Sequence, residues 1–265
     1  HELGSALQDR QFNEDGSLYY PEMWQAEHFG DVAVVNGKAW PKLEVDPAKY
    51  RIHFLAGGND RFWNIKLLES DAAGNVTSSV PGPAISQIGS DQGLLSNTVT
   101  FYDLDPAKGR LLMEPGSRYD VVIDFAGRQG EYFLVHNNAD APFDGTFPPS
   151  PEDYEAPLFE TFLIHVKDTT PYTDNATLPM SFMTPNAYNV SSSKRTRDWA
   201  MTEKMDGGVS VGLQLNGRGF MDGIFDMYLS LWAASPDALR LATRMGGTYF
   251  RLFQDVHSGY RRALT

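Results

Sequence analysis

The chain has 265 residues, of which 42% are hydrophobic and 12% aromatic, so it is long enough to bury the core of one large domain, or of one domain and part of another. Its 34 acidic residues against 22 Lys and Arg give a formal net charge of −12, which argues against nucleic acid and anionic membranes as partners. The chain contains no cysteine, which excludes disulfides, cysteine zinc sites, iron–sulfur clusters and thiol nucleophiles.

Short apolar or alternating runs, separated by Gly, Pro, Asn and Asp, dominate residues 1–170 and are typical of an all-β sandwich or barrel. Tyr50–Leu55 shows the alternation well, because its even positions are apolar while Arg51 and His53 fall on the other face. The predicted strands are Val32–Val35, Tyr50–Leu55, Phe62–Leu68, Ile85–Ile88, Leu111–Met113, Tyr119–Phe125, Tyr132–Asn137 and Phe159–Val166. Eight strands in this span fit a Greek-key sandwich.

Turn signals separate these strands. Asn36-Gly37 accepts the positive φ angles of a type I′ turn and predicts a hairpin after Val32–Val35. We expect further turns at Gly57-Gly58-Asn59 and Pro115-Gly116, and a polar loop at residues 89–93. Just after the Pro115-Gly116 turn, Arg118 and Asp120 can form an ion pair near the start of a strand.

The pattern changes after residue 168. Residues 169–193 are rich in Pro, Thr, Ser and Asn and predict a linker, and Thr196–Met201 and Val209–Asn216 again predict strands. Ser235-Pro236-Asp237 supplies the start of a helix at residues 236–245. The predicted division is a domain at 1–168, a linker at 169–193, and an incomplete second β unit with a short C-terminal helix at 194–265.

Four strings resemble the second domain of bacterial laccases and bilirubin oxidases, which belong to the multicopper oxidases. They are QDRQFNEDGSLYYP at 8–21, EHFGDVAVVNGKAWPKLEVDPAKYRIHFLAGGNDRFW at 27–63, ISQIGSDQGLL at 85–95 and MEPGSRYDVVIDF at 113–125. A shorter string, LNGRGFMDG at 215–223, is similar to the opening of the family's third domain. The resemblance implies a cupredoxin-like Greek-key β-sandwich, copper as the family's cofactor, and oxidation of phenolic or similar donors coupled to reduction of dioxygen.

The resemblance also implies that the copper ligands are absent from this chain. In the family the middle domain carries none of them, and the third domain continues to a His-Pro-x-His-x-His motif and a His-Cys-His motif. Here residues 235–256 read SPDALRLATRMGGTYFRLFQDV without a histidine, and the residues before Gln8 do not match the apolar strand of the family. We therefore expect a truncated sequence, and an internal fragment, a frame-disturbed gene or a degenerate homologue would each fit.

Six histidines are the candidate metal ligands, but none has a partner at metal-ligand spacing. They are His1, His28, His53, His136, His165 and His257. We interpret them as ordinary strand or loop histidines; the alternative is a histidine brace formed by the amine and imidazole of His1 with His257 or another histidine. The adjacent carboxylates of Glu152 and Asp153 are interpreted as solvated loop groups rather than an acid–base pair. No catalytic, cofactor-binding or metal-binding residue is assigned.

Two functions remain open. The first is a laccase-like multicopper oxidase acting on phenolic small molecules, for which the resemblance favours a secreted or periplasmic location. The second is a copper-free cupredoxin module that acts as a structural bridge or associates with itself through exposed aromatic side chains. The tryptophans available for this are Trp24, Trp40, Trp63, Trp199 and Trp232. Copper content and oxidase activity separate the two functions. Metal bound without blue colour would indicate a third case, a site built from unrelated histidines.

Overall fold

The computed structural model describes residues 1–22, 25–91, 93–101, 111–145, 156–172, 174, 176–182 and 195–219. These residues divide into two units, the first made of 1–22 and 27–182 and the second of 25–26 and 195–219, with the gaps given above. The regular elements of these stretches are β-strands, and no helix long and apolar enough to cross a membrane occurs among them.

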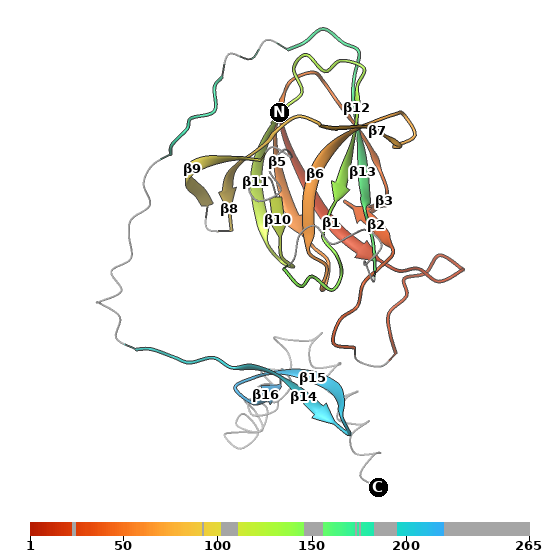
Figure 1. Ribbon diagram of the computed structural model, residues 1–265, viewed down its shortest axis with the longest axis vertical. Helices are drawn as coiled ribbons and strands as arrows, with labels where there is room; N and C mark the ends of the chain where they lie inside the picture. The colour runs from red at the N-terminus through yellow and green to blue at the C-terminus, as the bar shows by residue number, and fades with distance from the viewer. Residues whose placement is uncertain are drawn as a thin grey trace, which may run out of the picture. The chain divides into compact units, whose positions relative to one another are not determined.

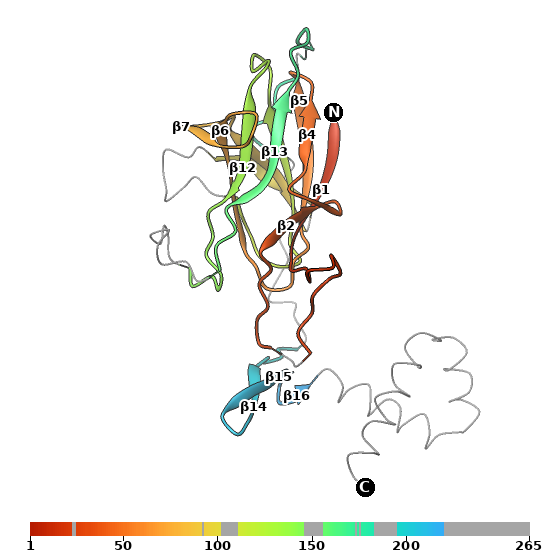
Figure 2. The same cartoon turned by 90° about the vertical axis from the view of Figure 1, so that its right-hand side faces the viewer.

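Two sheets pack face to face in the first unit (Figures 1 and 2). The seven-stranded sheet has the order β3-β2-β1-β5-β11-β8-β9. Its strands are β1 Glu2–Arg10, β2 Val32–Val35, β3 Lys38–Ala39, β5 Lys49–Ala56, β8 Ile85–Ser90, β9 Gly93–Phe101 and β11 Arg118–Asp124. Its strands pair antiparallel except for β1 and β5, which pair in parallel.

The six-stranded sheet has the order β10-β6-β12-β13-β4, with β7 also paired to β6. Its strands are β4 Lys42–Val45, β6 Trp63–Ser70, β7 Val76–Pro81, β10 Leu111–Met113, β12 Tyr132–Asn137 and β13 Glu160–Val166. Here β4 pairs in parallel with β13, and the other pairs are antiparallel. Each sheet therefore contains one parallel pair in an otherwise antiparallel arrangement.

The core lies between the two sheets and draws on alternate residues of each strand. On β5 the predicted inward positions are confirmed, since Tyr50, Ile52 and Phe54 are all buried. Trp63 on β6 and Phe133 on β12 meet them from the other sheet and are fully buried. All eight predicted strands are present, three with the predicted ends and five with ends that shift by one or two residues.

Five strands were not predicted: β1, β3, β4, β7 and β9. The first differs most from the sequence pattern, because residues 1–7 lack the apolar character of the corresponding strand in the family and still form a strand. Leu3 and Leu7 are the only large apolar residues of β1, yet the strand pairs with β2 on one side and β5 on the other. Because β1 lies between two strands, its backbone N–H and C=O groups find hydrogen-bond partners on both sides. This pairing stabilises the strand although its sequence shows only weak apolar alternation.

The hairpin predicted at Asn36-Gly37 is confirmed. Asn36 and Gly37 have φ angles of 50° and 82°, and Val35 pairs with Lys38 across the turn. The side chain of Asn36 also clamps β1, because its Oδ1 accepts from the Ala6 amide at 2.9 Å and its Nδ2 donates to the Gly4 carbonyl at 2.8 Å. The turn is therefore fixed to the sheet as well as closed locally.

The predicted ion pair between Arg118 and Asp120 is wrong. Arg118 pairs instead with Asp91 across the β8–β9 loop at 3.1 Å, and Asp120 pairs with Arg51 on β5. Asp120 lies directly opposite His53 on β5, and the long side chain of Arg51 reaches it along the diagonal between the two strands. Arg118 and Asp120 therefore each pair with a side chain outside β11.

Part of the predicted linker lies along the first sheet. Ser181 forms a bridge with Asn97 of β9, and the Phe182 amide donates to the Ser96 carbonyl at 2.8 Å. The segment thus adds backbone hydrogen bonds to an edge strand. The domain limits at 168 and 193 stay predictions.

The second unit is a three-stranded antiparallel sheet of β14 Met201–Asp206, β15 Val209–Leu215 and β16 Arg218–Gly219. The strand predicted at Val209–Asn216 is confirmed. The one predicted at Thr196–Met201 is misplaced, since β14 begins only at Met201. The tight turn at Gly207-Gly208 sets the hairpin register, so β14 begins five residues after the predicted start at Thr196. The helix predicted at 236–245 lies outside the described residues.

Candidate functional site

One histidine lies on the outer face of the seven-stranded sheet, in a charged cluster. His53 Nε2 is 2.6 Å from Glu2 Oε1, and its Nδ1 is 3.6 Å from Asp120 Oδ1. Arg51 donates to Asp120 from Nε to Oδ1 at 2.9 Å and from Nη2 to Oδ2 at 2.5 Å. The hydrogen bond from His53 lowers the pKa of Glu2 below its ordinary value, and Asp120 raises the pKa of Arg51. Each side chain of the cluster is already engaged by another side chain of the protein. The cluster therefore links β1, β5 and β11 and offers no unengaged metal ligand.

A second histidine lies on the outer face of the other sheet. His165 Nδ1 is 2.7 Å from Glu44 Oε2, and its ring stacks on Tyr132 with centroids 4.2 Å apart. Lys42 completes the group at 3.0 Å from Glu44 Oε1. The hydrogen bond from Lys42, and to a smaller extent that from His165, lowers the pKa of Glu44 below its ordinary value. This group joins β4, β12 and β13.

His136 differs from both because it is mostly buried and its Nδ1 has no protein partner. Its ring stacks on Phe159 with centroids 5.6 Å apart. Burial, aided by the positive charge of Lys66, lowers the pKa of His136 to about 4. The imidazole is therefore neutral at pH 7.

The remaining candidates are placed separately or lie beyond the described stretches. His1 stacks on Tyr50 with centroids 4.8 Å apart, and His28 lies beside the rings of Tyr19 and Tyr20. His257, Glu152 and Asp153 lie outside the described residues, as do Trp24 and Trp232. Trp63 belongs to the core, whereas Trp40 and Trp199 are exposed.

The described residues do not fit a copper site. They contain no group of three or more His, Cys, Asp or Glu side chains placed to hold a metal. The mononuclear copper of the family also needs a cysteine thiolate, and the chain has no cysteine. His1 stacks on Tyr50 and meets Tyr172 edge-on, and His257, the named partner for a histidine brace, lies outside the described residues.

A buried ion pair that the sequence did not indicate ties the start of the chain to the sandwich. Arg61 and Asp9 are both almost fully buried, with Arg61 Nε donating to Asp9 Oδ2 at 3.1 Å. The guanidinium also donates to the carbonyls of Gly30 and Ala156 at 2.8 Å and 2.9 Å. The Gly30 amide donates to the same Asp9 oxygen at 2.9 Å. Four segments distant in sequence thus meet on one charge pair.

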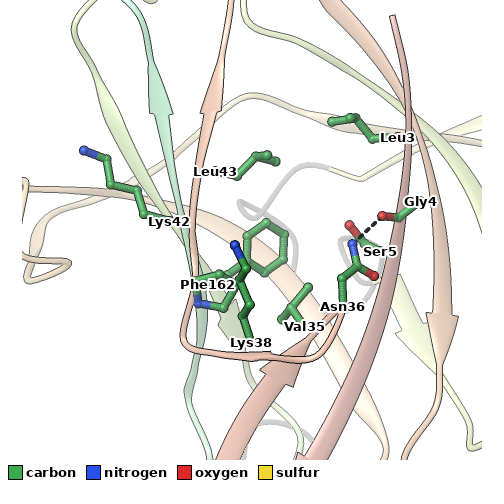
Figure 3. Close-up of a pocket in the computed structure, with 10 residues that line it drawn as sticks. Leu3, Gly4, Ser5, Val35, Asn36, Lys38, Lys42, Leu43 and Phe162 are labelled. Carbon is green, nitrogen blue, oxygen red and sulfur yellow. Dashed lines mark hydrogen bonds between the residues drawn. The ribbon is translucent and has the colours of Figure 1, made fainter.

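A pocket opens between the edges of the two sheets, with a cavity volume of about 240 Å³ (Figure 3). Its lining comes from β1, the β2–β3 hairpin, β4 and β13. Leu3, Val35, Leu43 and Phe162 supply the apolar part. The sequence pattern did not indicate this pocket, because the strands that form its walls belong to two different sheets.

The comparisons with known proteins converge on one family. A laccase of Haloferax volcanii is 32% identical over 255 residues, which is 94% of this chain and 39% of that protein. A laccase of Bacillus subtilis is 35% identical over 145 residues, which is 50% of this chain and 25% of that protein. A multicopper oxidase of Arabidopsis thaliana is 30% identical over 205 residues, which is 74% of this chain and 31% of that protein. The chain therefore spans at most about two fifths of these relatives. No protein-family model matches it.

Solved structures agree on the fold. A multicopper oxidase of Aquifex aeolicus superposes with a TM-score of 0.61 at 21% identity, over 83% of this chain and 41% of that one. A laccase of Pediococcus acidilactici superposes with a TM-score of 0.56 at 23% identity, over 82% of this chain and 38% of that one. The β-sandwich of the first unit is thus of the cupredoxin-like kind expected from the sequence.

Proposed function

Because this chain belongs to the multicopper oxidase family, we propose that residues 1–168 form the copper-free middle domain of a laccase-like oxidase, and that residues 194–265 belong to the domain that follows. In this proposal the whole oxidase couples oxidation of phenolic donors to reduction of dioxygen. The copper ions that supply this chemistry are held by residues outside the described part of the chain. The same proposal favours a secreted or periplasmic protein.

The observation that carries this proposal is the way the sandwich uses its polar groups. The interior between the sheets is a continuous apolar cluster. His53 and His165 face outward and are engaged by carboxylates, and the buried charge of Arg61 is saturated by Asp9 and two carbonyls. Such an arrangement stabilises a scaffold and leaves few side chains for redox chemistry.

The bridging role is supported by an ordered apolar surface near the β1–β2 connection. Phe12 bridges to Leu18, and the Tyr19 amide donates to the Gln11 carbonyl at 2.9 Å, so this segment forms a small hairpin. Leu18 and Tyr20 are 63% and 74% exposed there. Exposed apolar side chains on ordered backbone are typical of surfaces that another domain covers.

Oxygen uptake with a phenolic donor, measured on the chain after copper loading and dialysis, tests the proposal. We expect no turnover above that of free copper, because no described residues form a redox centre. Dioxygen consumption that requires the protein and is lost when His136 or His165 is replaced would contradict it.

The same hairpin favours the second candidate function, a copper-free module that associates with itself. Analytical ultracentrifugation of the native chain and of a Leu18→Ser/Tyr20→Ser variant separates the two cases. Dimers that dissociate in the variant would favour self-association, and monomers in both would favour a surface reserved for another domain.

A further inference from the structure

We propose that the pocket between the two sheets binds a small monocarboxylate with an apolar body about the size of benzoate, through the ammonium group of Lys38. The proposal concerns a site distinct from any oxidase chemistry and needs no copper.

The walls of the pocket suit an apolar body. Val35 and Phe162 are almost fully buried at its base, and Leu3 and Leu43 pack against the same core from the two sides. The backbone behind them is fixed, since β4 pairs with β13 and the Leu163 amide donates to the Pro41 carbonyl at 3.0 Å. A rigid apolar base of this kind binds a ligand without an ordering cost in the protein.

The charge at the pocket selects an anion. Two lysines and no acidic residue line it, although the chain carries a net charge of −12. Lys42 is engaged by Glu44 at 3.0 Å, whereas no ion pair of Lys38 occurs within the described stretches. In Figure 3, Lys38 extends from the hairpin alongside Phe162 and Leu43, while Lys42 points away. The ammonium group of Lys38 is therefore the positive charge that pairs with an anionic ligand in the pocket.

The remaining polar groups fix the rim rather than compete for the ligand. The amide of Asn36 is committed to β1 through the Gly4 carbonyl at 2.8 Å and the Ala6 amide at 2.9 Å. This holds the hairpin, and with it Lys38, against the edge of the sheet. A carboxylate is the group that a lysine ammonium pairs with most directly.

The volume limits the ligand to a single ring or a short branched chain. Pockets for drug-sized ligands span roughly 300–1,000 Å³. This cavity, at about 240 Å³, is smaller. One ring can lie against Phe162 and Leu43 while its carboxylate reaches Lys38 at the mouth.

The test titrates the native chain with benzoate, benzamide and benzylamine, which share a ring and carry negative, zero and positive charge. Backbone amide NMR shifts of Gly4, Asn36 and Leu43 report binding at the pocket. We expect benzoate to bind most tightly, about fivefold better than benzamide, because one partly exposed ion pair contributes up to about a factor of five.

Two variants and a matched control complete the test. Lys38→Gln should weaken benzoate binding about fivefold, and Lys167→Gln, the same change on a lysine that pairs with Asp46 outside the pocket, should leave it unchanged. Ser5→Leu should abolish binding by filling the space beside Leu3, with the fold checked by circular dichroism. Shifts that scatter over the surface, equal binding of benzamide and benzoate, or equal effects of the two lysine variants would overturn the proposal.

Discussion

Replacing Arg61 with methionine tests whether the buried ion pair holds the sandwich together. Methionine keeps most of the volume but removes the donors to Asp9, Gly30 and Ala156. Among the described residues, the Asp9 carboxylate would keep only the Gly30 amide as a hydrogen-bond partner while remaining buried. Breaking a buried pair by removing one partner costs about 3–5 kcal/mol, which is a large share of the roughly 5–15 kcal/mol that stabilises a domain.

Urea unfolding followed by circular dichroism measures this loss. Arg128→Met is the matched control, because Arg128 is partly exposed and pairs with Glu131 at 3.3 Å on the surface. It should change the free energy of unfolding by about 0.5 kcal/mol or less. The double variant Asp9→Asn/Arg61→Met should recover part of the loss, since no charge is then buried alone. A loss below about 1 kcal/mol for Arg61→Met would refute the reasoning.

Three further predictions concern stability. Asn36→Ala should lower the free energy of unfolding by about 1–2 kcal/mol in urea titrations, because it removes two hydrogen bonds to β1 and strains a position with a φ of 50°; no change would contradict this. Gly30→Ala should prevent native folding, seen as lost amide dispersion by NMR, because its Cβ would lie 2.4 Å from the Arg10 backbone nitrogen; a well-folded variant would be inconsistent with this packing. His136 has a pKa of about 4 when folded and near 6.5 when unfolded, so the unfolded chain takes up the proton first and stability falls as pH drops through that window. From pH 7 to 5 the native chain should lose about 2 kcal/mol more than His136→Phe in urea titrations at both pH values, and equal losses would refute the assignment.

Much of the fold could be predicted from the sequence because its strands obey the local rule of alternating burial. Tyr50, Ile52 and Phe54 are buried as their spacing indicates, and the Asn36-Gly37 turn forms as its φ requirements demand. Strands such as β1 and β9 could not be predicted in this way. β1 owes its conformation to backbone pairing with β2 and β5, which lie far from it in the sequence, and β9 is a largely exposed strand whose burial does not alternate.

The sites could be predicted less well, because they depend on which strands become neighbours. Asp9 and Arg61 are ordinary surface-type residues in the sequence, and only the fold buries them together. Lys38 likewise becomes part of a pocket only because the fold places it beside Phe162, which lies on a strand of the other sheet. The absence of cysteine was the one site-level feature that composition alone could establish.

Copper content per chain, measured by elemental analysis after loading with excess copper and dialysis, tests the central claim most directly. The account predicts that copper stays far below one equivalent and that no absorbance of a copper–thiolate centre appears, because the described histidines are dispersed and the chain has no cysteine. Stoichiometric copper that survives dialysis would contradict the claim that this chain is a copper-free part of a multicopper oxidase.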